Sequence, residues 1–333
     1  MQSIGIIGGG AWGTALGLVA LRAGRDPLLW AREADVVAVI NGRRENSLFL
    51  PGVPLDPRFG ATGDIGKTAA RDVLLLAAPA QHLRATARAL APHVKPAKPV
   101  VICAKGIEER SGALLSEVVA EALPQARVAL LSGPTFAAEV AQGLPTAITL
   151  AATDATLGQS LVQCLGSRAF RPYYTDDVVG AQIGGAIKNV IAIACGIVLG
   201  RKLGDNARAA LITRGLAEMA RLALAMGGRS ETLMGLSGLG DLTLTCTSLQ
   251  SRNCSLGVAL GEGRRLSDIL ASRRSVAEGV TSAAAAAELA QRFGIDMPIV
   301  AAVDAILHRG AAIDAAIEGL LSRPFRHEAR ASS

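Results

Sequence analysis

The sequence has few aromatic residues and no long run of basic ones, and this scarcity argues against a nucleic-acid-binding protein. Phe, Trp and Tyr together make up 3% of the 333 residues. A groove for single strands needs stacking aromatics beside a basic track, so no nucleic-acid partner is expected. The formal net charge of +6 is modest. A weak positive field of this kind suits small anionic ligands such as phosphates.

The cysteines form no CxxC pair and show no spacing typical of a metal site. Most of them lie in apolar surroundings, where a free cysteine is usually a small core residue. We therefore expect no bound metal, unpaired thiols and a cytoplasmic location. The five positions are Cys103, Cys164, Cys195, Cys246 and Cys254.

Two apolar stretches, residues 4–21 and 178–200, are long enough to be compared with membrane helices. The first has no basic segment before it and contains too many glycines for a spanning helix. The second carries Lys188 near its middle, where a cation would be costly in lipid but acceptable in a buried helix beside a polar cleft. Neither stretch is expected to cross a membrane.

The first half of the chain alternates short β-rich runs with helical stretches. Such alternation predicts βαβ crossovers and a parallel sheet covered on both faces. The expected elements are strands at 3–7, 27–30, 72–77, 99–103 and 127–131, a helix at 14–23, and further β runs at 146–150 and 170–174.

After about residue 178 the pattern changes to long Ala, Leu and Ile stretches with helical spacing. The expected helices are 178–200, 207–225, 276–293 and 298–307. The fold class is therefore α/β, with a parallel-sheet domain over residues 1–178 followed by an all-helical domain over residues 179–333. About two domains agree with the chain length.

The segment GGGAWG at residues 8–13 follows the first expected strand and opens a helix. It fits GxGxxG, in which Gly8, Gly10 and Gly13 provide a tight turn, close approach to a pyrophosphate and helix–strand packing. The helix N-terminus adds free N–H groups and a partial positive charge. The pattern predicts a Rossmann-type dinucleotide site. The alternative is a glycine-rich turn with a structural role alone.

The end of the second strand bears on which dinucleotide is bound. NAD enzymes usually place an acidic residue there for the ribose hydroxyls. Here Arg32 stands where a 2′-phosphate would lie, and Glu33 follows one place too late. We therefore expect NADP(H) to be preferred, with NAD(H) as the other nicotinamide cofactor. An ordinary surface arginine is the alternative reading of Arg32.

Lysine is rare, with six against 28 arginines, so each setting is informative. Lys105 directly follows the fourth strand, at the sheet edge where α/β proteins bind ligands. Lys188 lies within an apolar helix and needs a partner or a ligand. Since none of the four histidines lies in a polar cluster, a partly desolvated lysine is the candidate proton donor. The alternatives are a solvated loop cation for Lys105 and a structural ion pair for Lys188.

Residues 235–254 interrupt the helical pattern with glycines, hydroxyls and one carboxylate, which predicts a loop shaped around a ligand. Arg252 is suited to bidentate phosphate binding, with hydrogen bonds added by Ser251 and Asn253. Asp241 is expected to bind a substrate hydroxyl or to orient Lys188. An ordinary capped loop is the alternative.

Taken together, these motifs resemble the bacterial-type NAD(P)-dependent glycerol-3-phosphate dehydrogenases over nearly the whole chain. The matching segments are GGGAWGTAL at 8–16, AKG at 104–106, SGPTFAAEVA at 132–141, IKNVIAIACGI at 187–197, LGDNARAALITRGLAEM at 203–219, GLGDLTLTCTSLQSRN at 238–253 and AEGVTSA at 277–283. The order and spacing of the segments are more specific than any one of them.

The resemblance implies reversible reduction of dihydroxyacetone phosphate to sn-glycerol 3-phosphate, which feeds glycerophospholipid synthesis, with Lys188 as the proton donor. It also implies a fold like that of 6-phosphogluconate dehydrogenase, and a homodimer is compatible with it. The implied substrate contacts are Lys105, Gly133, Thr135, Lys188, Asp241, Ser251, Arg252 and Asn253. The implied cofactor contacts are Gly8, Gly10, Ala11, Trp12, Gly13, Arg32, Lys105, Ala137, Arg252, Val276 and Glu278.

The sequence departs from the family at two positions. Ala11 replaces a frequent serine, so one side-chain hydrogen bond is in question, and Ala104 replaces a common threonine. Two rival functions remain at this point. A β-hydroxyacid or 6-phosphogluconate-type dehydrogenase would carry Lys-x-x-x-Asn, whereas Asn189 follows Lys188 directly here. A regulator that binds NAD(P)H without turnover would have no need of both Lys188 and the polar cluster.

Overall fold

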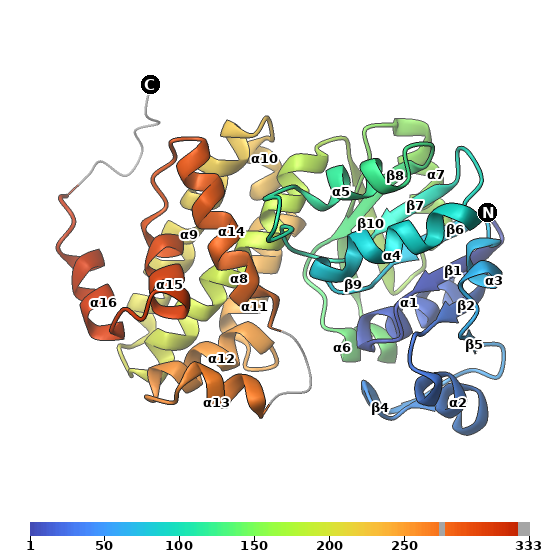
Figure 1. Cartoon of the computed structure of the whole chain (residues 1–333), viewed down its shortest axis with the longest axis horizontal. Coiled ribbons are helices and arrows are strands. Elements are labelled where there is room, and N and C mark those ends of the chain that lie inside the picture. The colour runs from blue at the N-terminus through green and yellow to red at the C-terminus, as the bar shows by residue number, and fades with distance from the viewer. Residues whose placement is uncertain (273–276, 326–333) are drawn as a thin grey trace.

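An eight-stranded sheet forms the centre of the N-terminal half, in the order β10-β9-β8-β7-β6-β1-β2-β5. The computed structural model describes residues 1–272 and 277–325 (Figure 1). The strands are β1 (Ser3–Ile7), β2 (Asp26–Trp30), β5 (Gly60–Thr62), β6 (Val73–Leu76), β7 (Pro99–Ile102), β8 (Arg127–Ser132), β9 (Thr146–Ala151) and β10 (Phe170–Thr175). All seven expected β runs are therefore confirmed as strands, with ends that shift by a residue or two.

One pairing differs from the expected parallel sheet, because β9 runs antiparallel to β8. A parallel neighbour requires a crossover that carries the chain back along the length of the strand, usually with a helix that spans the sheet. The connection here contains only the six-residue helix α6 (Ala137–Gln142). Such a helix is about 9 Å long, so the chain turns back at the edge where β8 ends. The next crossover, through α7 (Ala155–Leu165), restores parallel pairing between β9 and β10.

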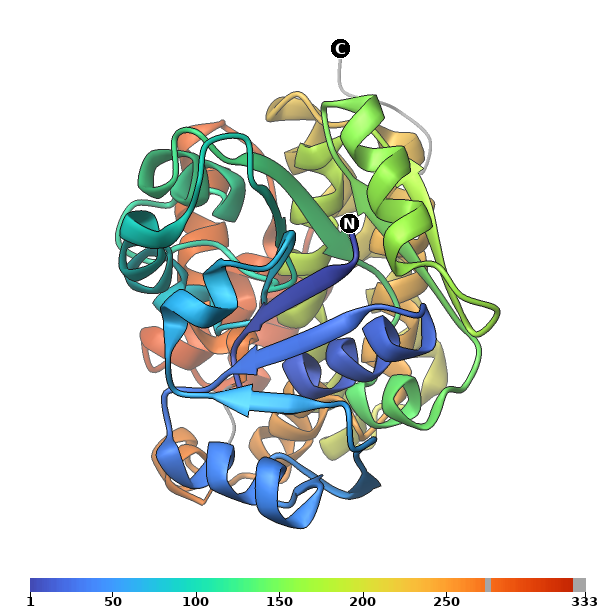
Figure 2. The same ribbon diagram turned by 90° about the vertical axis from the view of Figure 1, so that its right-hand side faces the viewer.

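Helices cover both faces of the sheet (Figure 2). Along β1 the side chains alternate, so that Ile4 and Ile6 pack with α1 (Ala11–Arg22) and Ile7 packs on the opposite face. The opposite face is covered by α3 (Ile65–Ala69), α4 (Leu83–Leu90) and α5 (Leu115–Ala122). The sequence did not anticipate α2 (Ala34–Arg43) or the hairpin of β3 (Glu45–Asn46) and β4 (Leu50–Pro54).

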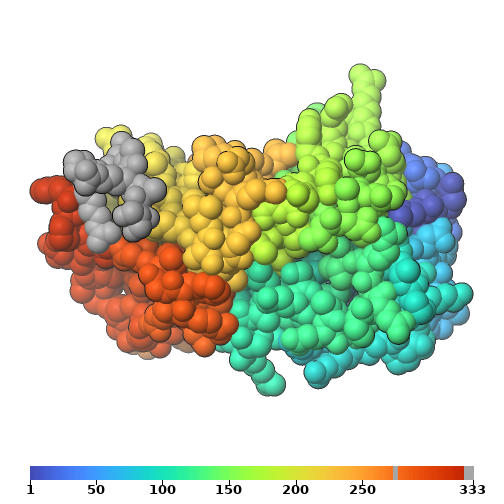
Figure 3. All heavy atoms as spheres, turned by 90° about the horizontal axis from the view of Figure 1, so that it is seen from above, coloured from blue at the N-terminus to red at the C-terminus, as the bar shows by residue number. Residues whose placement is uncertain are grey.

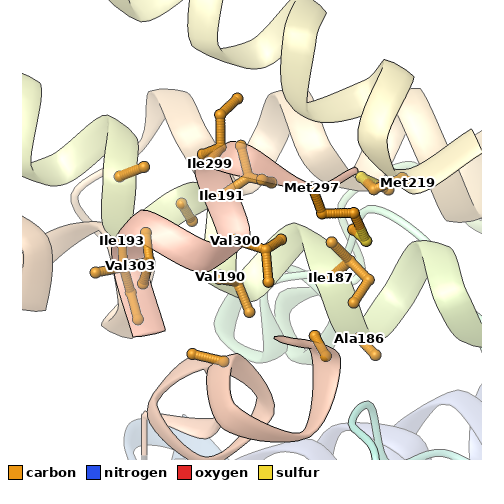
Figure 4. Close-up of a cluster of buried hydrophobic side chains, with 14 of the residues drawn as sticks. Ala186, Ile187, Val190, Ile191, Ile193, Met219, Met297, Ile299, Val300 and Val303 are labelled. Carbon is orange, nitrogen blue, oxygen red and sulfur yellow. The ribbon is translucent and has the colours of Figure 1, made fainter. Parts of the chain in front are cut away.

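The C-terminal half is built around α8 (Val178–Gly200), which is apolar on every side and almost entirely buried. The other helices of this half are α9 (Asp205–Ala225), α10 (Ser230–Leu233), α11 (Asp241–Thr247), α12 (Arg252–Gly261), α13 (Leu266–Ala271), α14 (Glu278–Arg292), α15 (Pro298–His308) and α16 (Ile313–Leu321). Of these, α13 packs on α12 and α16 packs on α15, and the rest contact α8 directly. In the core, Ile187 and Ile191 of α8 lie with Met219 of α9 and Val300 of α15 (Figure 4).

Glycines let the backbones of α8 and α12 approach closely. A Cβ atom on Gly196 would lie 2.1 Å from the carbonyl oxygen of Cys254, and one on Gly257 would lie 2.1 Å from that of Ile193. The two halves of the molecule lie end to end (Figure 3). By length and composition, α8 is the one helix of the described chain that could cross a membrane, but 89% of its most apolar window is buried inside the protein. All five cysteines are buried and unpaired, as expected.

Candidate active site

The glycine turn has the geometry that the motif predicts. Gly8 has φ +131°, and a Cβ there would lie 2.8 Å from the backbone carbon of Ala77. A Cβ on Gly13 would lie 2.0 Å from the Gly8 carbonyl oxygen, whereas one on Gly10 would meet nothing within 4 Å. Helix α1 begins at Ala11 without a side-chain cap. The turn therefore leaves open space beside uncapped N–H groups, which fits the pyrophosphate of a dinucleotide.

Trp12 links this turn to the end of β7. Its indole Nε1 donates a hydrogen bond of 3.1 Å to the carbonyl oxygen of Cys103, two residues before Lys105. The glycine turn and Lys105 thus lie at the same edge of the sheet, where the parallel strands end.

Lys188, Asp241 and Lys105 form one buried ionic cluster between the two halves of the protein. Lys188 Nζ donates to Asp241 Oδ1 at 2.6 Å and to the Thr245 hydroxyl at 2.8 Å. Lys105 Nζ donates to Asp241 Oδ2 at 2.7 Å and to the Gly133 carbonyl oxygen at 2.8 Å. One carboxylate therefore holds both ammonium groups, and its side chain is 1% exposed.

Two glycines of α8 allow this cluster to form. A Cβ on Gly185 would lie 2.7 Å from the hydroxyl of Ser132 and 3.4 Å from Cγ of Lys105. A Cβ on Gly184 would lie 2.3 Å from the carbonyl oxygen of Ser237. Because neither residue has a side chain, α8 can contact the end of β8 on one side and the segment before α11 on the other.

Burial lowers the pKa of Lys188 from 10.5 to about 8. The negative charge of Asp241 opposes this shift, and the positive charge of Lys105 adds to it. An amine with a pKa near 8 can both give and take a proton close to neutral pH.

The expectation of a loop over residues 235–254 is wrong. The segment forms a π-helical turn (Leu236–Gly240), then α11, a short break, and α12. Its glycines permit close packing, since a Cβ on Gly238 would lie 1.9 Å from the Leu233 carbonyl oxygen. Asp241 and Thr245 are four residues apart in α11 and therefore lie on one face of this helix.

The start of α12 brings together the other residues of the polar cluster. Ser251 caps the helix by accepting a hydrogen bond of 3.2 Å from Cys254 N, and the exposed Arg252 is its first residue. Asn253 donates to Asn189 Oδ1 at 2.9 Å and accepts from Gly279 N at 3.0 Å. The Asn253 amide thus ties α12 to α8 and α14.

Several other expected site residues lie around this cluster. Glu278, the first residue of α14, accepts a hydrogen bond of 3.4 Å from Ala80 N. Burial raises its pKa, which the charge of Arg252 opposes. Thr135 donates to the Gly133 carbonyl oxygen at 3.2 Å, and Ala137 opens α6. The structure therefore places α14 and the loop after β8 at the same site.

Two of the expected cofactor contacts, Arg32 and Val276, are not among the residues placed around this cluster. The side chain of Arg32 is 79% exposed and pairs with the neighbouring Glu33 at 2.9 Å. Val276 lies outside the described residues. Within the described part of the chain, no group of three or more His, Cys, Asp or Glu residues could hold a metal ion.

Family models match both halves of the chain. The N-terminus of NAD-dependent glycerol-3-phosphate dehydrogenase matches residues 3–158, and the C-terminus of the same family matches residues 177–318. The chain belongs to this family. The resemblance seen in the sequence motifs and the expected fold class are therefore confirmed.

Curated relatives from bacteria match along nearly their full length. A glycerol-3-phosphate dehydrogenase [NAD(P)+] from Parvibaculum lavamentivorans is 58% identical over 98% of both chains. One from Rhodospirillum rubrum is 57% identical over 100% of this chain and 96% of its own. The crystal structure of glycerol-3-phosphate dehydrogenase from Coxiella burnetii is 40% identical, with a TM-score of 0.92 over 97% of this chain and 99% of that one.

Within this glycerol-3-phosphate dehydrogenase fold, the sequence did not predict the contacts that two residues make in the site. Thr245 accepts a hydrogen bond from Lys188, and Asn189 holds Asn253. The spacing of Thr245 from Asp241 was a usable signal, because residues i and i+4 share a helix face. A helical spacing was not expected there, because the glycines and hydroxyls of the segment predict a loop. Asn189 gave no signal beyond its position after Lys188.

Proposed function

We propose that this protein catalyses the reduction of dihydroxyacetone phosphate to sn-glycerol 3-phosphate with NADPH or NADH, and the reverse oxidation. The observation that carries the proposal is the buried cluster of Lys188, Asp241 and Lys105 beside a dinucleotide-type glycine turn. Membership of the glycerol-3-phosphate dehydrogenase family supports it, as do the names of the bacterial relatives.

In the proposed mechanism Lys188 handles the proton. An ammonium has three N–H donors, and Asp241 and Thr245 accept two of them. The third is left for the oxygen on C2 of the substrate. The nicotinamide cofactor supplies a hydride when bound. As the carbonyl is reduced, Lys188 donates a proton to that oxygen, and in the reverse direction neutral Lys188 accepts it.

The neighbouring residues have binding roles in this proposal. Lys105 places a second positive charge beside the reacting oxygen. Arg252 anchors the phosphate from the start of α12, together with Ser251 and Asn253. The further substrate contacts that we propose are Gly133, Thr135 and Asp241. The proposed cofactor contacts are Gly8, Gly10, Ala11, Trp12, Gly13, Arg32, Lys105, Ala137, Arg252, Val276 and Glu278.

The finer assignments are also proposals. Arg32 favours NADPH over NADH because its exposed guanidinium follows β2, where a 2′-phosphate would lie. The cofactor domain spans residues 1–178 and the substrate domain spans residues 179–333. The enzyme acts in the cytoplasm as a homodimer, and its product enters glycerophospholipid synthesis.

The test is the loss of nicotinamide absorbance with dihydroxyacetone phosphate, measured with each reduced cofactor. We expect ketone-dependent oxidation of both cofactors and a higher kcat/KM with NADPH. Equal or lower kcat/KM with NADPH would contradict the cofactor preference alone. Absence of oxidation, with NAD(P)H still bound, would instead support a dinucleotide-binding regulator. Turnover of β-hydroxyacids or 6-phosphogluconate in place of the triose phosphate would support the rival dehydrogenases.

A further inference from the structure

Asn46 lies outside the glycine motif but contacts it directly. It ends the two-residue strand β3, in the hairpin that follows α2, and is 1% exposed. Its amide Nδ2 donates to the Gly9 carbonyl oxygen at 2.9 Å and to the Thr14 hydroxyl at 2.8 Å. Its Oδ1 accepts from Phe49 N at 3.3 Å, within the hairpin. The buried amide thus joins the hairpin to the turn.

The contact with Gly9 fixes the direction of a neighbouring donor. The carbonyl of Gly9 and the N–H of Gly10 belong to one planar trans peptide, in which the two groups point in opposite directions. Because the carbonyl points to Asn46, the Gly10 N–H points away from the hairpin. Unlike Gly8, Gly9 and Gly13, Gly10 has open space around it, since a Cβ there would meet nothing within 4 Å.

The contact with Thr14 reaches the next peptide, whose carbonyl oxygen also accepts the Thr14 backbone N–H at 3.0 Å. The hydroxyl of Thr14 donates to the Gly10 carbonyl oxygen at 3.0 Å while it accepts from Asn46. The Gly10 carbonyl shares its peptide with the Ala11 N–H, the first donor of α1. One side-chain amide therefore holds two successive peptides, the first directly and the second through Thr14.

We propose that Asn46 is a positioning residue for dinucleotide binding, which aims the Gly10 and Ala11 N–H groups at the pyrophosphate. Glycine residues have an unusually wide choice of backbone conformations, so the turn needs an external restraint to hold its donors in one direction. The hairpin supplies that restraint from outside the motif. The inference rests on the proposed use of a nicotinamide dinucleotide.

The experiment compares Asn46→Ala and Asn46→Asp with the wild-type enzyme, by titration of NADPH and of ADP-ribose. ADP-ribose carries the pyrophosphate without the nicotinamide ring. We expect the Kd of both ligands to rise about tenfold in Asn46→Ala, as fits the loss of two hydrogen bonds. Asn46→Asp keeps the shape and the acceptor for Phe49 but adds a negative charge, so its Kd rises further. At saturating NADPH, kcat stays near the wild-type value.

Asn41 provides a matched control. Its side chain also makes two backbone hydrogen bonds in the same half of the protein, donating to Ala61 O at 2.9 Å and accepting from Ala61 N at 3.0 Å. Both of these bonds join α2 to β5 and neither involves the glycine turn. Asn41→Ala is therefore expected to lower Tm without changing the Kd of NADPH or ADP-ribose.

Thr14→Val separates positioning from folding. Valine has nearly the shape of threonine at this fully buried site, but it removes both the hydroxyl donor to the Gly10 carbonyl oxygen and the acceptor for Asn46 Nδ2. The bond from Asn46 to Gly9 remains. We expect an intermediate rise in Kd. The inference would be overturned if Asn46→Ala or Asn46→Asp folds and binds both ligands with wild-type affinity. If neither Asn46 variant folds, wild-type affinity in folded Thr14→Val would overturn it. A wild-type enzyme that binds neither NADPH nor NADH would instead overturn the proposed function.

Discussion

Lys188 donates a hydrogen bond of 2.6 Å to Asp241, although the two residues lie 53 positions apart and on different helices. Both side chains are nearly inaccessible to water. A buried ammonium is unfavourable without a partner, and the Asp241 carboxylate partly offsets its desolvation. Since the same carboxylate also binds Lys105, it must balance two positive charges. Because one negative charge faces two positive ones, the ammonium form of Lys188 is only partly stabilised and can give up its proton.

The first prediction concerns the pH dependence of the reaction. The pKa of Lys188 is lowered to about 8 by burial, and the ammonium form is the proposed acid for ketone reduction. The kcat/KM for dihydroxyacetone phosphate should therefore fall as pH rises above 8. The kcat/KM for glycerol 3-phosphate oxidation should rise through the same pH, because the neutral amine is the base. Initial rates in both directions from pH 7 to 10 check this, and flat profiles would contradict it.

A second prediction concerns Arg252, the exposed first residue of α12. Arg252→Ala should raise the KM for dihydroxyacetone phosphate by about tenfold to a hundredfold, as expected for the loss of a charge-assisted contact, with a smaller change in kcat. Arg264, which is also exposed and lies beyond the far end of α12, provides the control. Arg264→Ala should leave the KM unchanged. An unchanged KM in Arg252→Ala would remove this residue as the phosphate anchor.

A third prediction concerns Glu218, a buried carboxyl that the proposed reaction does not use. It lies in α9 and accepts hydrogen bonds from Ile299 N at 2.8 Å and Val300 N at 3.2 Å, at the start of α15. Burial raises its pKa from 4.5 to about 7, against the effect of the two N–H groups. Glu218 thus caps α15 from a neighbouring helix, at the cost of desolvating a carboxylate.

The sign of the effect follows from proton binding. Between pH 4.5 and 7 the folded state holds a proton that the unfolded state has lost, so this group lowers the free energy of unfolding as pH rises. The change amounts to about 3 kcal/mol. Urea unfolding at pH 5 and pH 8 should show the wild type losing about 2.5 kcal/mol relative to Glu218→Gln, because part of the change lies below pH 5. Glu288→Gln, an exposed change on α14, is the control. A pH-independent difference between wild type and Glu218→Gln would contradict the prediction.

Much of the fold could be predicted because local patterns determine it. The limits of α8 follow from a long, mainly apolar stretch, and β1 and the glycine turn follow from adjacent signals in the first residues. The reversal of β9 was not predictable from its own residues, because strand direction depends on how far the short α6 can carry the chain. The hairpin that carries Asn46 was missed because its strands are too short to show an alternating pattern.

The site was predictable to a similar degree. Lys188 was conspicuous as a cation within an apolar helix, and Lys105 as a residue that follows a strand. Their shared bond to Asp241 is a tertiary contact that neither local pattern contains. Residues 235–254 were assigned to a loop because glycine and hydroxyl residues usually favour turns. In the folded protein those glycines serve close packing against α8 and α10.

The central claim is that Lys188 supplies the proton, and the most direct test is turnover by Lys188→Met and Lys188→Ala. Methionine keeps the length and apolar stem of lysine without its charge. We predict that both variants lose at least about a hundredfold in kcat, which is within the range of general acid catalysis, while the Kd for NADPH stays near the wild-type value. A variant that folds, binds NADPH and reduces dihydroxyacetone phosphate at a nearly normal rate would contradict the account.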